Sequence, residues 1–264
     1  MKLKVSCELD FDIETPTPFV FMLRPRSGAL QWVVRDEFRL TPEVTAFEFT
    51  DGYGNLCQRL TAPAGPFQVE TLAEVVTSPE TDRQPGAPFV EIQFLPDAVM
   101  SYILPSRYCE SDRLFERTMD VVGSALPGYD QVAAIESWLR EQVSYVPGSS
   151  EIPNSALEIL AAGRGVCRDL SHLGIAMCRS ISIPSRLVVG YLHELEPMDM
   201  HAWFEAYVGG RWFTFDATQQ ALPGGYVPLA YGRDAADVAL YTQFGTPVPL
   251  KRQVVSVVRL EDDA

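Results

Sequence analysis

Short apolar runs separated by turn-forming residues dominate the first hundred residues of the chain. The runs are rich in β-branched and aromatic residues, and glycine-containing turns are expected at 51–55 and 84–88. This pattern is typical of strands. The predicted strands cover residues 19–23, 32–34, 46–49, 68–76 and 89–95. No reactive group stands out among them, so we expect an all-β accessory domain here.

The apolar pattern acquires a helical period after Pro105 and Ser106. Helices are expected from about residue 111 to 125, from residue 130 onward, and over residues 155–162. A further helix is indicated by apolar residues at spacings of 4, 3, 4 and 4. These residues are Val166, Leu170, Leu173, Met177 and Ile181.

The last third of the chain returns to strand patterns. Strands are expected at 186–192, 201–208 and 211–216, and one more apolar run lies at 254–260. The chain is therefore predicted to be α+β. We expect a β-rich domain at residues 1–106 and a second domain at 107–264.

Composition and net charge exclude some classes of binding partner. Of its 264 residues, 47% are hydrophobic and 21% are charged, and the net charge is −14. Such a surface repels phosphate groups, so neither nucleic acid nor an anionic membrane is an expected partner. No apolar stretch has the length of a membrane span, and the N-terminal residues lack the apolar core of a signal peptide. These features predict a cytoplasmic protein, and they leave its oligomeric state open.

Cys167 is the first candidate for chemistry. It is one of five cysteines, an odd number that suggests free thiols, and it lies at the predicted start of the helix over residues 166–181. The partial positive charge and the free N–H groups of a helix N-terminus stabilise a thiolate. The same N–H groups can stabilise an oxyanion on a carbonyl under attack. The competing interpretation is a buried structural cysteine, for which Cys178 is the better example.

A metal site built from Cys167, His172 and Cys178 is excluded by helix geometry. His172 would point about 140° away from Cys167, and Cys178 would lie about 16 Å along the helix axis. Side chains so placed cannot meet one zinc ion. We therefore expect no metal, and no cofactor is indicated.

A predicted β-hairpin places a histidine beside an aspartate. Gly209 and Gly210 separate two apolar runs, which indicates a two-residue turn. The resulting register puts His201, Trp203 and Asp216 on one face of the sheet. His201 and Asp216 become diagonal neighbours about 7 Å apart, within reach of a side-chain hydrogen bond. The alternative is a strand histidine near an unrelated aspartate.

Together, Cys167, His201 and Asp216 have the composition of a catalytic triad. Cys167 would attack a carbonyl, His201 would activate the thiol and protonate the leaving amine, and Asp216 would orient the imidazole. Trp203 would lie opposite Asp216 and exclude water from the His–Asp hydrogen bond, or it would simply be part of the core.

These segments resemble a known family. Residues 165–173, around Cys167, resemble the cysteine motif of bacterial transglutaminase-like proteins, many of which are named as cysteine proteases. Residues 183–191 are similar to the strand segment of that family, and residues 231–238 to its C-terminal segment. Residues 201–205 and 212–218 resemble its histidine and aspartate motifs.

The resemblance implies a papain-like core preceded by a β-rich domain, with Cys167, His201 and Asp216 as the triad. Trp203, Arg168 and Tyr191 are expected to contact the substrate. The sequence departs from the family at Arg168, where glutamine is common, at Ala217, where proline is usual, and at residues 180–182. The arginine next to the nucleophile suggests a different substrate preference. The imidazole of His172 points away from Cys167 and is expected to be structural.

The predicted reaction is acyl transfer from a peptide or protein amide through a thioester. Water as the acceptor makes the protein a cysteine protease or amidase, which is the leading hypothesis. An amine as the acceptor makes it a transglutaminase or an amide ligase. A non-catalytic binding module with the same fold is the alternative from another class, and a complete triad argues against it.

Overall fold

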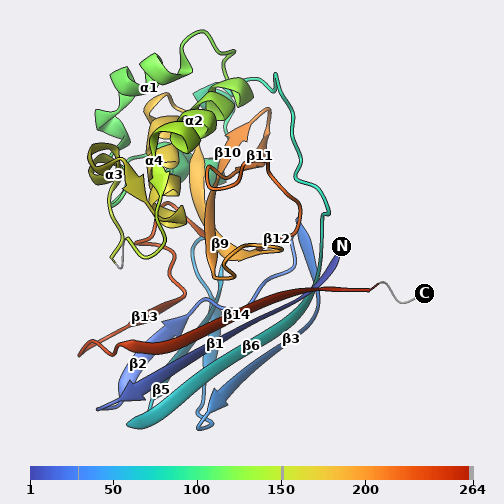
Figure 1. Cartoon of the computed structure of the whole chain (residues 1–264), viewed down its shortest axis with the longest axis vertical. Coiled ribbons are helices and arrows are strands. Elements are labelled where there is room, and N and C mark those ends of the chain that lie inside the picture. Colours follow the sequence, from blue (N-terminus) through green and yellow to red (C-terminus); the bar gives the residue numbers. More distant parts are fainter. Residues whose placement is uncertain (29, 150–151, 262–264) are drawn as a thin grey trace.

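The computed structural model describes residues 1–28, 30–149 and 152–261. Helices gather at one end of the molecule and long strands at the other (Figure 1). The described chain contains three four-stranded sheets and one short parallel strand pair. No helix in the described part of the chain is long and apolar enough to cross a membrane.

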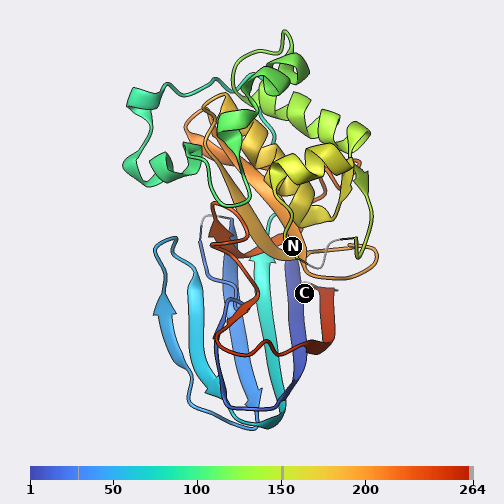
Figure 2. The same cartoon turned by 90° about the vertical axis from the view of Figure 1, so that its left-hand side faces the viewer.

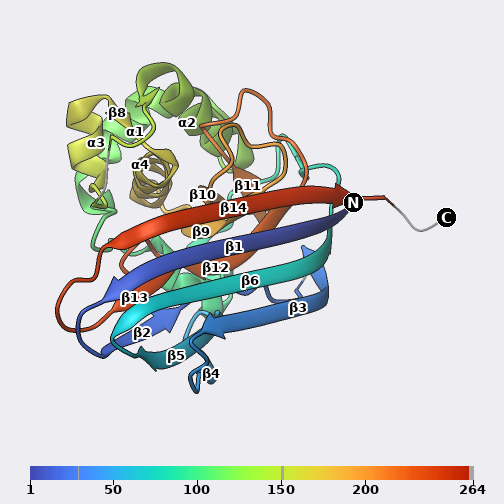
Figure 3. The same ribbon diagram turned by 60° about the horizontal axis from the view of Figure 1, so that its bottom comes forward.

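Two antiparallel sheets form the β-rich end of the molecule (Figure 3). The first has the order β14-β1-β6-β3, formed by Leu250–Leu260, Lys2–Ile13, Gly65–Thr77 and Gln31–Thr41. The second has the order β13-β2-β5-β4, formed by Tyr241–Gln243, Thr17–Phe21, Leu56–Ala62 and Phe47–Thr50. Alternate residues of β1 are buried, and Phe11 of β1 contacts Phe19 of β2 at a ring distance of 5.3 Å. The two sheets therefore share one apolar core.

The last strands of the chain belong to these same sheets. β14 pairs with β1 over its length, and β13 pairs with β2. Figure 2 shows both C-terminal segments beside the N-terminal strands. A division of the chain near residue 106 stays a prediction, and the topology adds that the C-terminal strands return to the N-terminal layers.

The helical end contains a third sheet, with the order β11-β10-β9-β12. Its strands are Arg211–Phe215, His201–Val208, Ser185–Leu192 and Tyr226–Gly232. The helices are α1 (Phe115–Val122), α2 (Tyr129–Gln142), α3 (Ala156–Ala162) and α4 (Cys167–Ser180). Short 3-10 segments cover Ile92–Phe94, Asp97–Ile103 and Ser111–Arg113, and β7 (Ser144–Tyr145) runs parallel to β8 (Arg164–Gly165).

One face of the third sheet packs against α4. Leu170, Leu173 and Met177 of the helix share a core with Phe204 and Ala206 of β10. Gly174 permits this contact, because a Cβ atom there would lie 2.8 Å from the ring of Phe204. The apolar stripe predicted for this helix is thus the face that the sheet covers.

The strand predicted over residues 89–95 is wrong. The described backbone there forms a 3-10 turn at Ile92–Phe94, and Phe94 is 73% exposed. Pro88 and Pro96 flank the segment. Proline lacks the N–H that a central strand needs, and no strand pairs with this segment in the described chain.

Candidate active site

Cys167 is the first residue of α4, as predicted. The Asp169 carboxylate accepts a hydrogen bond from the Val166 backbone N–H at 3.2 Å and so caps the helix start. Gly165 is required beside it, since a Cβ atom there would lie 2.8 Å from the Cβ of Asp169. All five cysteines lie in the described residues, and Cys167 alone is partly exposed. The thiol is therefore held at a helix N-terminus and can be reached by a substrate.

The other four cysteines are buried. Burial raises the pKa of the thiols of Cys7, Cys109 and Cys178 to about 12, and that of Cys57 to about 11. These thiols are protonated and inaccessible at neutral pH, so they do not compete with Cys167 as nucleophiles.

His201 and Asp216 meet as the hairpin predicts. The observed register pairs Val208 with Arg211 and Phe204 with Phe215, as expected. Gly209 and Gly210 both have positive φ angles, of 58° and 85°, which a tight two-residue hairpin turn needs. The His201 Nε2 atom lies 2.6 Å from Asp216 Oδ2, and the ring N–H donates to the carboxylate.

The electrostatics of this pair favour its charged form. Burial by itself lowers the pKa of His201, but the Asp216 carboxylate and a hydrogen bond with the Cys167 side chain raise it to about 10. Burial by itself raises the pKa of Asp216, whereas His201 and Thr218 hold it below its ordinary value. An imidazolium next to Cys167 stabilises the thiolate.

The raised pKa of His201 predicts a pH-dependent contribution to stability. The folded pKa of about 10 lies above the ordinary value of 6.5. The protonated imidazole therefore stabilises the fold fully below about pH 6.5, and this contribution is lost as the pH rises toward about 10. The free energy of unfolding of the wild type should therefore exceed that of His201→Gln, and the difference should be largest at about pH 6. Linkage gives a difference on the order of a few kcal/mol there. Urea denaturation of both proteins between about pH 6 and 10 measures this difference, and a difference that stays constant would contradict the expectation.

Three groups that sequence reasoning missed hold Asp216 in place. The Tyr226 hydroxyl donates to Asp216 Oδ2 at 2.9 Å, and Thr218 donates to Oδ1 through its N–H and its hydroxyl. The Glu136 carboxylate accepts from the Asp216 backbone N–H at 2.7 Å. Only Thr218 could have been found from the sequence, because it follows Asp216 by two residues, a common spacing for such a turn. Tyr226 and Glu136 come from β12 and α2.

Trp203 lies against the His–Asp pair. Its ring centroid is 6.0 Å from that of His201 and 4.9 Å from that of Tyr226, and the side chain is fully buried. This position suits either of its two predicted roles, shielding the hydrogen bond from water or packing alone. Direct contact with a substrate at Cys167 stays a prediction.

Substitutions of Trp203 separate the two roles. If the indole shields the pair, Trp203→Ala should lower activity by roughly tenfold or more and alter its pH profile, because water weakens the buried hydrogen bond. Trp203→Phe should largely preserve both, since the phenyl ring still excludes water. The measurement is kcat/KM from about pH 5 to 10 for both variants. Unchanged kinetics in folded Trp203→Ala would leave packing as the only role.

The other two predicted substrate contacts differ in position. Arg168 follows Cys167, is partly exposed, and lies 3.4 Å from the Asp169 carboxylate. A substrate contact by Arg168 stays a prediction. Tyr191 is 1% exposed and belongs to the apolar core with Leu9 and Val227. The alternation of β9 turns this side chain into the β-rich layers, and its contact with a substrate stays a prediction.

His172 occupies a buried position away from the thiol. Its Nδ1 atom lies 2.9 Å from the Asn154 carbonyl oxygen, and Nε2 accepts from the Ala235 N–H at 3.2 Å. The ring stacks on Tyr108, and burial lowers its pKa to about 4. No group of three or more His, Cys, Asp or Glu side chains within the described residues is arranged to hold a metal ion.

Comparisons with known proteins identify the family of the chain. A sequence model of the "Transglutaminase-like superfamily" matches residues 116–217, a span that contains Cys167, His201 and Asp216. The structure also superimposes on that of a "Putative Cysteine Protease" from Cytophaga hutchinsonii with a TM-score of 0.91 and 35% identity. The match covers 100% of this chain and 92% of that chain. The chain belongs to the transglutaminase-like superfamily.

Two further relatives come from mycobacteria. An uncharacterized protein of Mycobacterium leprae is 26% identical over 254 residues, covering 90% of this chain and 91% of that protein. An uncharacterized protein of Mycobacterium tuberculosis is 31% identical over 119 residues, covering 39% of this chain and 38% of that protein. The likeness to the first relative extends over both the β-rich and the helical ends of the molecule.

Proposed function

We propose that this transglutaminase-like protein cleaves a peptide or amide bond through a thioester on Cys167. The observation that carries the proposal is the 2.6 Å hydrogen bond between the buried residues His201 and Asp216. It orients an imidazole that also interacts with the partly exposed Cys167 thiol at a helix N-terminus. The solved relative described as a "Putative Cysteine Protease" supports the same reaction class.

Each group has a step in the proposed reaction. The Cys167 thiolate attacks the amide carbonyl carbon, and the C=O electron pair moves onto oxygen, which the N–H groups at the start of α4 stabilise. As the C–N bond breaks, the imidazolium of His201 donates its proton to the departing amine. Water then attacks the thioester, His201 accepts a proton from that water, and the acid and the free thiolate are released.

Asp216 acts by orientation and charge. Its carboxylate holds the His201 ring through Nε2, which leaves the other ring nitrogen toward Cys167, and it stabilises the imidazolium. Tyr226 and Thr218 keep the carboxylate fixed through hydrogen bonds to both of its oxygens. The substrate class supported by this chemistry is a peptide or protein amide, and no cofactor takes part in it.

Product analysis shows whether water or an amine is the acceptor of the acyl group. The wild-type protein is incubated with a library of peptides and glutamine-containing peptides in 18O-water, with and without an added primary amine. Hydrolysis is expected to place one 18O atom in the acid product, whereas a transglutaminase would yield the amine adduct instead. Protein alkylated at Cys167 by iodoacetamide is the control and should form neither product. Absence of products from the unmodified protein across the library, with no thioester trapped by hydroxylamine, would overturn the proposal in favour of a binding module.

A further inference from the structure

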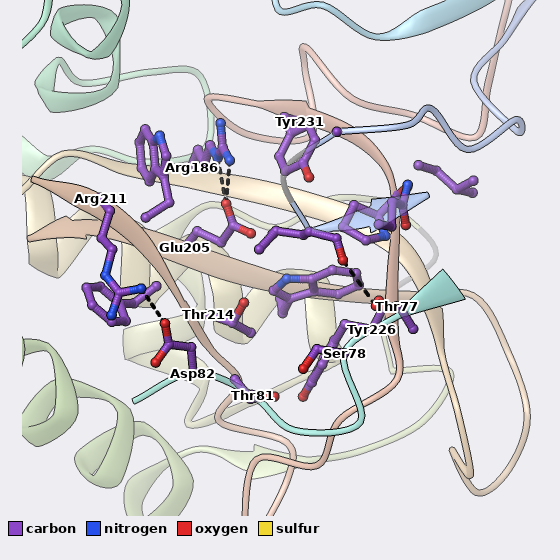
Figure 4. Close-up of a pocket in the computed structure, with 18 of the residues that line it drawn as sticks. Thr77, Ser78, Thr81, Asp82, Arg186, Glu205, Arg211, Thr214, Tyr226 and Tyr231 are labelled. Atoms are coloured by element: carbon purple, nitrogen blue, oxygen red, sulfur yellow. Dashed lines mark hydrogen bonds and ion pairs between the residues drawn. The ribbon is translucent and has the colours of Figure 1, made fainter. Parts of the chain in front are cut away.

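A cavity of about 780 Å³ lies behind the proposed site. It faces the side of the third sheet that α4 does not cover, and its walls include Trp203 and Thr214 of that sheet. The opposite wall comes from the β-rich end and includes Gln31. Thr77, labelled in Figure 4, belongs to the same wall. None of the three proposed triad residues lines it. Its volume is in the range of small-molecule sites.

The cavity has rigid aromatic walls. The Arg186 guanidinium lies between the rings of Trp212 and Tyr231, 4.2 and 4.1 Å from their centroids. Its ion pair with Glu205, at 2.6 Å, fixes it further. Tyr226 extends the aromatic lining. Walls of this kind bind flat apolar or aromatic groups by stacking and edge contacts.

The charges of the lining cancel. Three arginines and three acidic residues line the cavity. Arg186 is paired with Glu205, and Arg211 is paired with Asp82 (Figure 4). The remaining two, Arg26 and Glu80, are exposed. An ionic ligand would have to compete with existing ion pairs, so the lining favours an uncharged ligand.

Two buried polar atoms of the lining have no hydrogen-bond partner among the described residues. They are the indole nitrogen Nε1 of Trp203, whose side chain is fully buried, and the carboxamide oxygen Oε1 of Gln31, which is 7% exposed as a residue. The Gln31 amide nitrogen is already used, since it donates to the carbonyls of Arg26 and Pro228. Buried polar atoms are normally paired. A ligand that supplies one acceptor and one donor would satisfy both atoms.

We propose that this cavity binds a small uncharged molecule that carries an aromatic ring and an amide group. The ring is received by the aromatic walls, the amide oxygen accepts from the Trp203 indole N–H, and the amide N–H donates to Gln31 Oε1. The ligand would thus contact Trp203 and Tyr226, which themselves touch the His201–Asp216 pair. Binding is independent of the proposed thiol chemistry.

The Trp203 indole N–H is the reporter for the test. The chain has four tryptophans, so the NMR spectrum of a 15N-labelled sample contains few indole N–H signals. The signal that is lost in Trp203→Phe belongs to Trp203. The probe is N-acetyl-L-phenylalaninamide. We expect its addition to move the Trp203 N–H signal downfield with saturation and a Kd of about 1 mM or tighter, as for a ligand of this size.

Matched variants locate the binding. Thr214→Phe fills the cavity and should weaken binding by about tenfold or more, whereas Thr242→Phe, at an exposed strand position outside the cavity, should leave it unchanged. Thr214→Leu replaces Thr214→Phe if the larger side chain prevents folding. Protein alkylated at Cys167 should show the same shift as unmodified protein. An unmoved Trp203 signal, or an equal shift in the Thr214 variant, would overturn the proposal and leave ordered water as the partner of these atoms.

Discussion

Replacing Cys167 with alanine is expected to lower kcat/KM for amide cleavage on the order of 10⁴- to 10⁶-fold, the loss seen when the nucleophile of a covalent-catalysis enzyme is removed. The reason is that no other thiol in the chain can take over, because the remaining four are buried and their pKa values are raised by burial. The measurement is the steady-state rate on a peptide substrate found in the 18O-water screen. Substrate binding should persist, since the change removes only a sulfur atom.

Cys178→Ala is the matched control for this substitution. Cys178 belongs to the same helix but lies in the core, so its loss should cost a modest amount of stability, roughly 1 kcal/mol, and leave kcat/KM nearly unchanged. Loss of activity in a folded Cys178→Ala protein that matches the loss in Cys167→Ala would mean that the assignment of the nucleophile is wrong.

His201→Ala is expected to have the second largest effect, on the order of 10³- to 10⁶-fold in kcat/KM. The variant loses both the proton donor to the leaving amine and the cation that stabilises the thiolate. The Cys167 thiol should therefore react more slowly with iodoacetamide, because no neighbouring cation stabilises its thiolate. Iodoacetamide labelling at a series of pH values measures this directly, with peptide mapping to identify the labelled cysteine.

His172→Ala tests whether the effect is specific to the His201 position. His172 is uncharged at neutral pH and bonds to Asn154 and Ala235, so its loss should destabilise the fold without slowing the labelling of Cys167. The comparison is made at a temperature where far-UV circular dichroism shows both variants folded. Slower Cys167 labelling in folded His172→Ala, to the extent seen in His201→Ala, would contradict the assigned roles.

The elements that could be predicted are those whose signals are local. The spacing of Leu170, Leu173 and Met177 predicts α4, and the glycines at 209 and 210 predict the turn that sets the β10–β11 register. From these two elements follow the helix-start position of Cys167 and the meeting of His201 with Asp216. The sequence pattern did not predict β1, although apolar and polar residues alternate along it. Its polar face carries Glu8, Asp10 and Asp12, which gives this part of the sequence the composition of a charged N-terminal segment.

The pairing of strands that are far apart in the sequence could not be predicted from the local pattern of residues. Nothing in residues 250–260 shows that this strand pairs with β1, and the segment at residues 89–95 reads as a strand until its flanking prolines and its lack of a partner are considered. Strand propensity depends on the neighbours that a segment finds, and those neighbours are far away in the chain.

By itself, the sequence determined the chemistry of the candidate site: a thiol at a helix start, and an imidazole and a carboxylate on one face of a hairpin. These depend on helical and strand periodicity and on one tight turn, which act over a few residues. The tertiary structure alone decided what surrounds the site. It brought Tyr226 and Glu136 to Asp216, turned Tyr191 into the core, and left Trp203 between the His–Asp pair and a cavity. Most of those contacts join separate strands and helices, because burial of their apolar faces, and not any local pattern, sets which of them become neighbours.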